Sequence, residues 1–279
     1  MRTIDLALGK RRLELHLWEH NLKKIYLSLL TIAHAGIVAA FGITLFCVFE
    51  AAAQTPSPIS VPFVGCAADG QVGPIAPPKI PQTIPTAPPA AAQQLAYYAS
   101  THLGVFGPRG WHCFELYGSS GSTLIVTPER HNASDFLRSD GKLKGPAVQL
   151  SRSSGGTSGR VEVARVAARI FPAFGSFVQQ VIDEGMMPKT EFPTGPYPTD
   201  TLTRRSDTEV EFLTAANREG LGTNSRIAKN GQAIRGVAIL LPEDDMDLVM
   251  LATRLPPELL ALAPVIVQMV ERDLGTPQT

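Results

Sequence analysis

The sequence predicts an α+β domain with a mainly antiparallel sheet built from hairpins and helices packed against it. Apolar, β-branched runs occur in pairs joined by short polar turns, as in hairpins. Two amphipathic helical patterns lie mid-chain and one lies at the C-terminal end. The resulting order of strands, two helices, strands and a helix is typical of α+β domains, and the glycine-rich βαβ signature of nucleotide-binding folds is missing from the sequence.

The N-terminal segment is predicted to be an export signal. Residues 1–24 are basic and rich in leucine, and residues 25–49 carry no formal charge when histidine is neutral. This charge asymmetry predicts a cytoplasmic N-terminus and export of the remainder. Small residues at Ala51 and Ala53 fit a cleavage site, which makes residues 1–53 a signal peptide. Residues 25–49 are also long enough to cross a bilayer, so an uncleaved signal anchor in the inner membrane is the alternative.

Charge and length limit the classes of function. The chain has 279 residues, enough for one domain of about 200 residues plus extensions. Residues 54–279 carry 19 basic and 21 acidic side chains. Because no excess of positive charge is left to neutralise phosphates, we expect no nucleic-acid partner. The expected location is the periplasm or the cell exterior.

A proline-rich segment separates the signal from the domain. Residues 74–92 contain seven prolines and almost no charge, which favours extended polyproline geometry. We therefore interpret residues 54–92 as a linker, or as an extended arm that lies on the domain. The domain proper is expected over residues 93–273, followed by a tail at 274–279.

The cysteines predict one disulfide. Cys47 lies in the apolar N-terminal segment, which leaves Cys66 and Cys113 in the exported part. Two cysteines in an oxidising compartment most simply pair with each other. The bond would close a loop of about 48 residues, for which the chain-entropy estimate of stabilisation is about 4 kcal/mol.

The first half of the domain is predicted to be mostly strands. Residues 91–101 have the pattern of a short helix. Residues 111–117 and 122–127 are rich in aromatic and β-branched side chains and flank a Gly-Ser-Ser-Gly turn, which predicts a hairpin. Residues 146–151 indicate another strand, and the glycine- and serine-rich residues 152–160 a flexible loop.

Two helices are expected next. Residues 160–171 carry one apolar stripe opposite charged positions. Residues 173–185 place apolar side chains at i, i+3, i+4, i+7 and i+8, and Gly185 is positioned to end this helix.

The last part of the chain is predicted to hold two hairpins and a helix. Residues 201–206 and 208–214 form the first hairpin, with Val210 and Phe212 pointing inward and Arg204 and Arg205 facing Glu209 and Glu211. The strands at 233–241 and 247–255 carry apolar residues on both sides, so both of their faces should be covered.

The final helix is expected over residues 256–273. Its two leading prolines, at positions 256 and 257, suit a first helical turn. Pro264, eight positions into the segment, should kink or split the helix because it lacks a backbone N–H.

The stretches that resemble catalytic motifs lack the geometry or the sequence context that catalysis requires. Neighbouring strand residues point to opposite faces of a sheet, so His112 is not able to activate Cys113. The turn at 118–121 does not match the G-x-S-x-G pattern of a nucleophilic serine. The spacings of histidine, cysteine and acidic residues match no metal site, and we predict no catalytic residue, metal or cofactor.

These observations favour a non-enzymatic envelope domain that binds another envelope protein or a small ligand. The loop at 217–226 is the candidate binding element, with Arg218, Asn224 and Arg226 available for a carboxylate or a sugar. The alternative is a secreted hydrolase whose site forms around the 111–131 hairpin region. Its candidate residues are Glu115, His112, His131 and the serines of the turn at 119–122.

Four stretches resemble exported bacterial proteins of unassigned function. They read VPFVGCAADGQVGP, PRGWHCFELYGSSGSTLIVTP, NREGLGTNSRIAKNGQAIRGVAIL and LATRLPPELLALAP. The resemblance spans residues 60–272. It implies an envelope or periplasmic location and nothing about activity.

Overall fold

The computed structural model describes residues 57–137, 141–242 and 245–274. These residues belong to one compact unit. The predicted signal peptide or anchor, with its apolar segment at 25–49, lies outside the described residues. Within the described ranges, no helix combines the length and apolar character that crossing a membrane requires.

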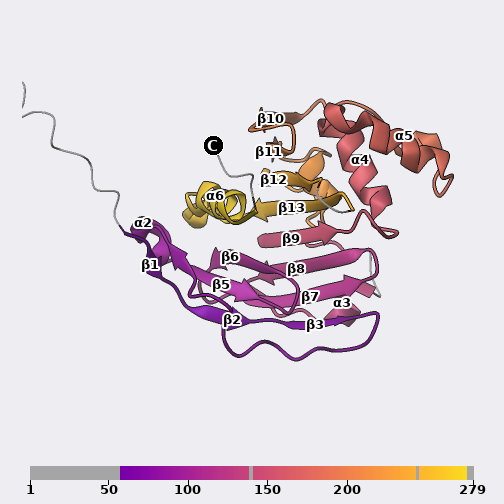
Figure 1. Ribbon diagram of the computed structural model, residues 1–279. Coiled ribbons are helices and arrows are strands. Elements are labelled where there is room, and N and C mark those ends of the chain that lie inside the picture. Colours follow the sequence, from indigo (N-terminus) through magenta and orange to yellow (C-terminus); the bar gives the residue numbers. More distant parts are fainter. Residues whose placement is uncertain (1–56, 138–140, 243–244, 275–279) are drawn as a thin grey trace, which may run out of the picture. The chain divides into compact units, whose positions relative to one another are not determined.

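An eight-stranded sheet forms the centre of the domain (Figure 1). Its strands, in spatial order, are β10 (Asp200–Arg204), β11 (Glu209–Thr214), β12 (Ile234–Leu241), β13 (Asp247–Arg254), β9 (Ala147–Ser153), β8 (Gly121–Thr127), β7 (His112–Gly118) and β3 (Ala67–Gly70). All neighbours pair antiparallel except β3, which runs parallel to β7. The predicted α+β class with a mainly antiparallel sheet is confirmed, as are the predicted hairpins of the large sheet.

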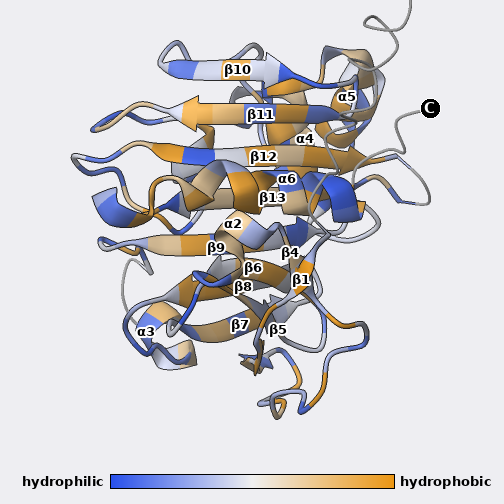
Figure 2. Cartoon of the chain, turned by 90° about the vertical axis from the view of Figure 1, so that its left-hand side faces the viewer, coloured by the Kyte–Doolittle hydropathy of each residue, from blue (hydrophilic) through white to orange (hydrophobic). Residues whose placement is uncertain are grey.

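Helices cover both faces of this sheet. Helices α4 (Arg160–Ile170) and α5 (Gly175–Asp183) lie on one face, and α6 (Leu262–Leu274) lies on the other (Figures 1 and 2). The short helix α3 (Ala133–Leu137) contributes Phe136 to the core on the α4 side. The two cores draw on alternate residues of the same strands, so both faces of β12 and β13 are buried, as predicted.

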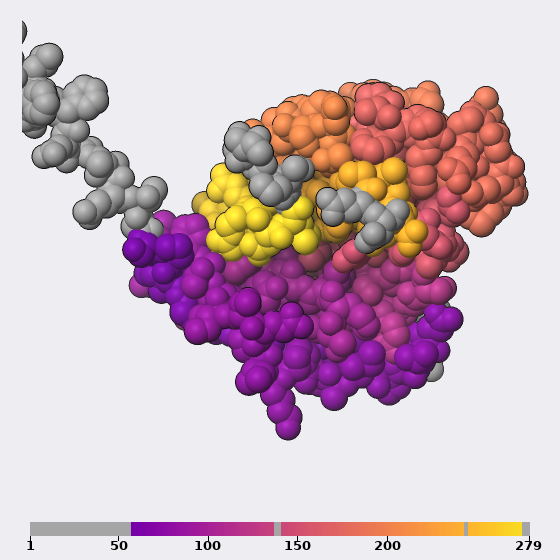
Figure 3. All heavy atoms as spheres, viewed as in Figure 1, coloured from indigo at the N-terminus to yellow at the C-terminus, as the bar shows by residue number. Residues whose placement is uncertain are grey.

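Smaller sheets complete the α6 side. They comprise β2 (Phe63–Gly65), β5 (Leu95–Ala99) and β6 (Gly104–Pro108) in one sheet, and β1 (Ile59–Ser60) with β4 (Thr86–Ala87) in the other, followed by helix α2 (Pro89–Ala92). Figure 2 shows α2 and α6 in front of the large sheet. In Figure 3, α6 (yellow) lies at the surface between the purple N-terminal part and the orange β10–β11 region. Residues 57–92 therefore lie on the domain as an extended arm with short strands.

Two predicted helices differ in the structure. The helix expected over 91–101 is wrong: α2 ends at Ala92 and strand β5 follows, because β2 and β6 pair with both its edges and bury Leu95 and Tyr98. Near the C-terminus, a single 3-10 turn at Pro257–Leu259 precedes α6. Pro264 falls in the first turn of α6, where its missing N–H has no helical partner to lose, and the helix runs on uninterrupted to Leu274.

Three further 3-10 turns connect the elements, at Pro172–Phe174, Lys189–Glu191 and Leu221–Asn224. In the β10–β11 hairpin, Val210 and Phe212 are buried as predicted. Arg205 pairs with Glu211, but Arg204 donates to the carbonyl of Ile170 at 2.6 Å instead of facing Glu209.

The predicted Cys66–Cys113 disulfide is confirmed, with an S–S distance of 2.01 Å. It joins the residue before β3 to the second residue of β7, directly beside the first pair of the parallel ladder, Ala67 and Phe114. The bond therefore fixes the edge strand β3 to the large sheet, where a parallel pairing has no short connection to support it.

Candidate functional site

Polar side chains line the large sheet where helices leave it uncovered, between α3 and the first turn of α4. Thr123, Gln149, Ser151 and Ser153 lie on the α4 face of β8 and β9, alternating with core residues that point to the α6 face. They line two adjoining hollows of about 480 and 310 Å³, which share Thr123, Ser153 and Arg226. We call these two hollows together the polar groove.

Arg226 lies where the two hollows meet. Its guanidinium group rests over the ring of Phe136, 5.4 Å from the centroid. Its one side-chain hydrogen bond to a described residue is long, at 3.5 Å to the carbonyl of Gly141. Partial burial lowers the pKa of this guanidinium. Among the described residues, no carboxylate lies within ion-pair distance of it, so the groove presents a partly desolvated cation with donors available to a ligand.

Several hydrogen bonds hold the segment that carries Arg226. Its backbone N–H donates to Gln149 Oε1 at 2.8 Å, and its carbonyl accepts from the backbone N–H of Leu143 at 2.7 Å. Arg254, completely buried at the end of β13, donates to the carbonyls of Leu143, Gly145 and Ala228. These contacts join the segments 141–145 and 226–228, so Arg226 projects from a rigid support.

The far end of the groove contains both signs of charge. Glu162, in the first turn of α4, has a pKa raised by burial, an effect that Arg165 and Lys142 oppose. Lys142 Nζ donates to the carbonyls of Thr223 and Ser225 at 3.1 and 2.7 Å. Asn224 Oδ1 accepts from the hydroxyl of Tyr197 at 3.0 Å, at the border of a third hollow of about 320 Å³.

The three residues predicted for binding separate in space. Arg226 and Asn224 line the polar groove, whereas Arg218 is exposed and lines none of the hollows described above. The polar floor was missed in the sequence, although Thr123, Gln149 and Ser151 alternate with apolar positions in their strands. That alternation was a usable signal for a sheet face left open to solvent.

The hydrolase candidates of the hairpin do not assemble. His131 lies 3.6 Å from Asp135 at the surface of α3. Glu115 is buried on the α6 side and pairs with His102, which sequence reasoning did not select for a hydrolase. No hydrogen bond within the described part of the chain connects His112 or His131 to Glu115 or to the serines of the turn. Cys113 is held in the disulfide, and no cluster of three potential metal ligands occurs among the described residues.

Comparison with protein-family models, with curated proteins and with solved structures finds no match to this chain. Functional assignment therefore depends on the chemistry of the groove and its surroundings. The groove combines hydroxyl and amide groups on its floor with the guanidinium of Arg226, which has no carboxylate partner within the described ranges.

Proposed function

We propose that this protein is an exported domain of the bacterial envelope that binds a small hydroxylated carboxylate, such as an acidic sugar, in the polar groove. The observation that carries the proposal is Arg226, a partly buried guanidinium without a carboxylate partner among the described residues. The planar fork of an arginine matches a carboxylate through two parallel hydrogen bonds. Such a ligand would supply a carboxylate partner for Arg226.

The floor of the groove suits the hydroxyl groups of the same ligand. Thr123 and Ser151 pair directly across β8 and β9, which places two hydroxyl-bearing side chains next to each other on one face. Serine and threonine hydroxyls both donate and accept hydrogen bonds, as sugar hydroxyls do. A ligand that combines hydroxyls with one carboxylate would therefore satisfy both parts of the groove.

Other features support export. A disulfide is typical of oxidising compartments such as the periplasm. The apolar segment at 25–49 and the resemblance to exported bacterial proteins favour the same location. Both envelope attachment and a free periplasmic state are compatible with ligand binding in the groove.

Binding of galacturonate, glucuronate and neutral galactose to the purified, disulfide-bonded protein tests this proposal by calorimetry. We expect the uronates to bind and galactose to bind more weakly, because only the uronates offer a carboxylate to Arg226. The R226Q variant should lose about tenfold or more in affinity, equivalent to about 1.4 kcal/mol. R218Q is the matched control, since Arg218 belongs to the same predicted loop but lies outside the groove.

A second comparison separates recognition of hydroxyls from simple anion binding. The S151A and T123V variants should weaken uronate binding without changing the weak binding of acetate. Equal uronate affinities of R226Q and R218Q would contradict the proposal, and so would the absence of uronate binding to the wild-type protein.

A further inference from the structure

A buried carboxylate on the α6 side of the sheet is paired with a single histidine. Glu115 in β7 is completely buried, and its Oε2 lies 2.9 Å from Nδ1 of His102. Its other carboxylate oxygen has no hydrogen-bond partner among the described residues. Because removing a carboxylate from water costs several kcal/mol, an acid held this way calls for an explanation beyond packing.

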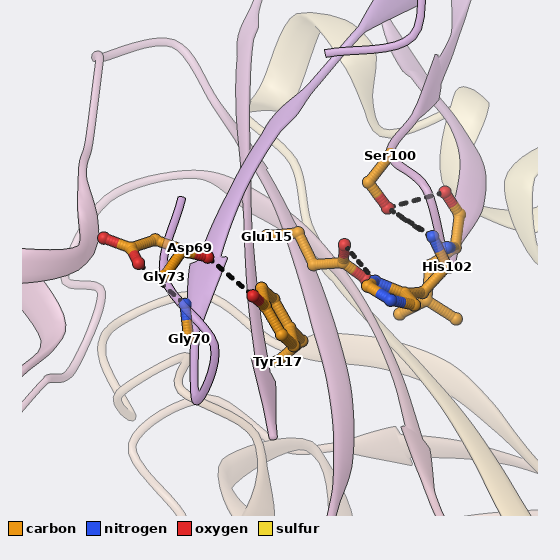
Figure 4. Close-up of polar contacts among 8 residues, drawn as sticks. Asp69, Gly70, Gly73, Ser100, His102, Glu115 and Tyr117 are labelled. Carbon is orange, nitrogen blue, oxygen red and sulfur yellow. Dashed lines mark hydrogen bonds and ion pairs between the residues drawn. The ribbon is translucent and has the colours of Figure 1, made fainter. Parts of the chain in front are cut away.

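The imidazole of His102 is held in a fixed orientation (Figure 4). His102 lies in the turn between β5 and β6, where its backbone N–H donates to Ser100 Oγ at 3.3 Å. Its ring packs against Tyr117 at a centroid distance of 5.0 Å, and the Tyr117 hydroxyl donates to the carbonyl of Gly73 at 2.6 Å. In the tautomer that carries its proton on Nδ1, the imidazole donates to Glu115 and has its lone pair on Nε2.

His102 borders two hollows. The larger, of about 400 Å³, is bounded by the proline-rich arm, including Pro78 and Pro81. The smaller, of about 180 Å³, is mainly apolar and is lined by residues of β6, β9, β13 and α6, such as Phe106 and Met269. His102, whose side chain is 38% exposed, therefore lies between a polar and an apolar hollow, where a base could act on a bond that joins a polar group to an apolar group.

A hydrogen-bond donor lines the same two hollows. Tyr97 of β5 is partly buried, and its hydroxyl has no hydrogen-bond partner among the described residues. Burial raises the pKa of Tyr97, with a smaller contribution from Asp273, so the phenol stays protonated at neutral pH. A protonated phenol can donate to an oxyanion.

The geometry points to an esterase site in which His102 is the general base, Tyr97 the oxyanion donor and Glu115 the positioning residue. The substrate class is a carboxylic ester with a short apolar acyl group in the smaller hollow and its alcohol part in the larger one. This inference concerns a different face of the sheet from the polar groove and does not depend on ligand binding there.

The reaction is a hydrolysis in two steps. A water oxygen bonds to the ester carbonyl carbon while Nε2 of His102 takes a proton from that water, and the Tyr97 hydroxyl donates a hydrogen bond to the resulting oxyanion. The intermediate then collapses, the bond from carbon to the alcohol oxygen breaks, and the proton on Nε2 passes to the leaving alkoxide. Glu115 holds the imidazole tautomer and stabilises the imidazolium between these steps.

Hydrolysis of p-nitrophenyl acetate, butyrate and octanoate by the purified, disulfide-bonded protein tests the inference. We expect saturable hydrolysis that favours the short acyl chains, since the acyl hollow is small. H102Q should remove the saturable rate, and Y97F should lower kcat by about 10²-fold. H131Q is the matched control, because His131 also lies near a carboxylate, Asp135, but at the surface.

The test of Glu115 has to distinguish its role in positioning His102 from a role in folding alone. E115Q keeps the size of the side chain but removes its charge, so kcat should fall by about 10²-fold or more while KM stays within about twofold. Intact mass and circular dichroism would establish that the variants retain the disulfide and the fold. If E115Q does not fold, Y97F and H102Q still decide the question.

Two results would overturn the inference. One is a wild-type protein that hydrolyses none of the three esters faster than H102Q. The other is hydrolysis that H102Q and H131Q reduce equally, since that pattern identifies nonspecific surface catalysis by histidine.

Discussion

Loss of the Cys66–Cys113 bond should destabilise the domain by about 4 kcal/mol. The two cysteines are 47 residues apart, and the chain-entropy relation for a loop of that length gives about 4 kcal/mol at 25 °C. For a domain of this size, such a loss corresponds to a decrease in Tm of about 10 °C. The effect arises mainly in the unfolded chain, which gains freedom when the cross-link is removed.

Urea unfolding of wild type and of the C66A/C113A double variant measures this difference. The urea midpoint should be lower in the double variant than in wild type. The midpoint of wild type should fall by the same amount when a reductant is present. The double variant with added reductant is the matched control, because it has no Cys66–Cys113 bond to lose and its midpoint should not change. Intact mass with a thiol-alkylating reagent confirms the redox state of each sample.

A double variant whose free energy of unfolding lies within about 1 kcal/mol of wild type would refute this entropic account of the bond. That result would mean that the segment between the two cysteines, which contains β5 and β6, is already restricted in the unfolded chain. A loss well above about 5 kcal/mol would instead show that the bond also supports native packing of β3 on β7.

Two further predictions concern ionisable side chains. Burial and the neighbouring carboxylates of β11 raise the pKa of Glu271 to about 7 from 4.5, so this carboxyl stabilises the protein below about pH 4.5 and the contribution is lost as the pH rises through about 7. In urea unfolding at pH 8, the free energy of unfolding of E271Q should therefore exceed that of wild type by about 1 kcal/mol after allowance for partial solvent exposure, and the difference should be small at pH 5. E258Q, at an exposed position, should match wild type. Equal pH dependence of the stabilities of E271Q and wild type would exclude this role for Glu271. R254M should destabilise by about 3 kcal/mol, because it removes the donor to the carbonyls of Gly145 and Ala228 and one of the two donors to the carbonyl of Leu143. R218M, at an exposed position, should change stability by less than about 0.5 kcal/mol. A small effect of R254M would mean that solvent or other groups replace these bonds.

The sequence pattern correctly predicted those helices and strands whose turn residues and apolar spacing lie close together in the chain. The hairpin at 111–127 and the helix at 173–185 were found because their turn residues and apolar spacing are written within one short window. Residues 91–101 failed for the opposite reason. Their alanines and tyrosines fit a helix in isolation, but strands β2 and β6 offer hydrogen-bond partners on both edges, and tertiary pairing overrides local propensity.

The strand pairings of the arm at 57–92 could not be predicted from the sequence, because β2 and β3 pair in parallel with strands much later in the chain. Strand β3 pairs with β7 more than forty residues later, and no turn signal announces such a pairing. The arm also folds back on itself: a side chain at Gly65 would lie only 2.1 Å from the carbonyl oxygen of Pro78. Proline content predicted an extended backbone over 74–92, whereas the structure places the short strand β4 and helix α2 at the end of this range. Proline content also carried no information about what the backbone would pair with.

For the candidate sites too, local features could be predicted from the sequence and contacts between distant segments could not. Arg226 and Asn224 were selected because they lie in a polar, glycine-containing loop, a local feature. The pairing of His102 with Glu115 brings together a turn of the small sheet and a strand of the large one, and the two residues share no motif. Only the packing of one sheet on the other creates this contact, so neither residue could be assigned a partner from the sequence.

Strand β13 connects the two proposed sites and also keeps them separable. Its neighbouring residues Val249 and Met250 point to opposite faces, so Val249 lines the small hollow near His102 and Met250 lines the polar groove. Truncation of Val249 to alanine should therefore widen the acyl hollow and shift ester preference toward longer chains, with uronate binding unchanged. Truncation of Met250 should affect only the groove. If either substitution alters both activities, the two faces are coupled through the strand, and the sites would have to be treated as one functional unit.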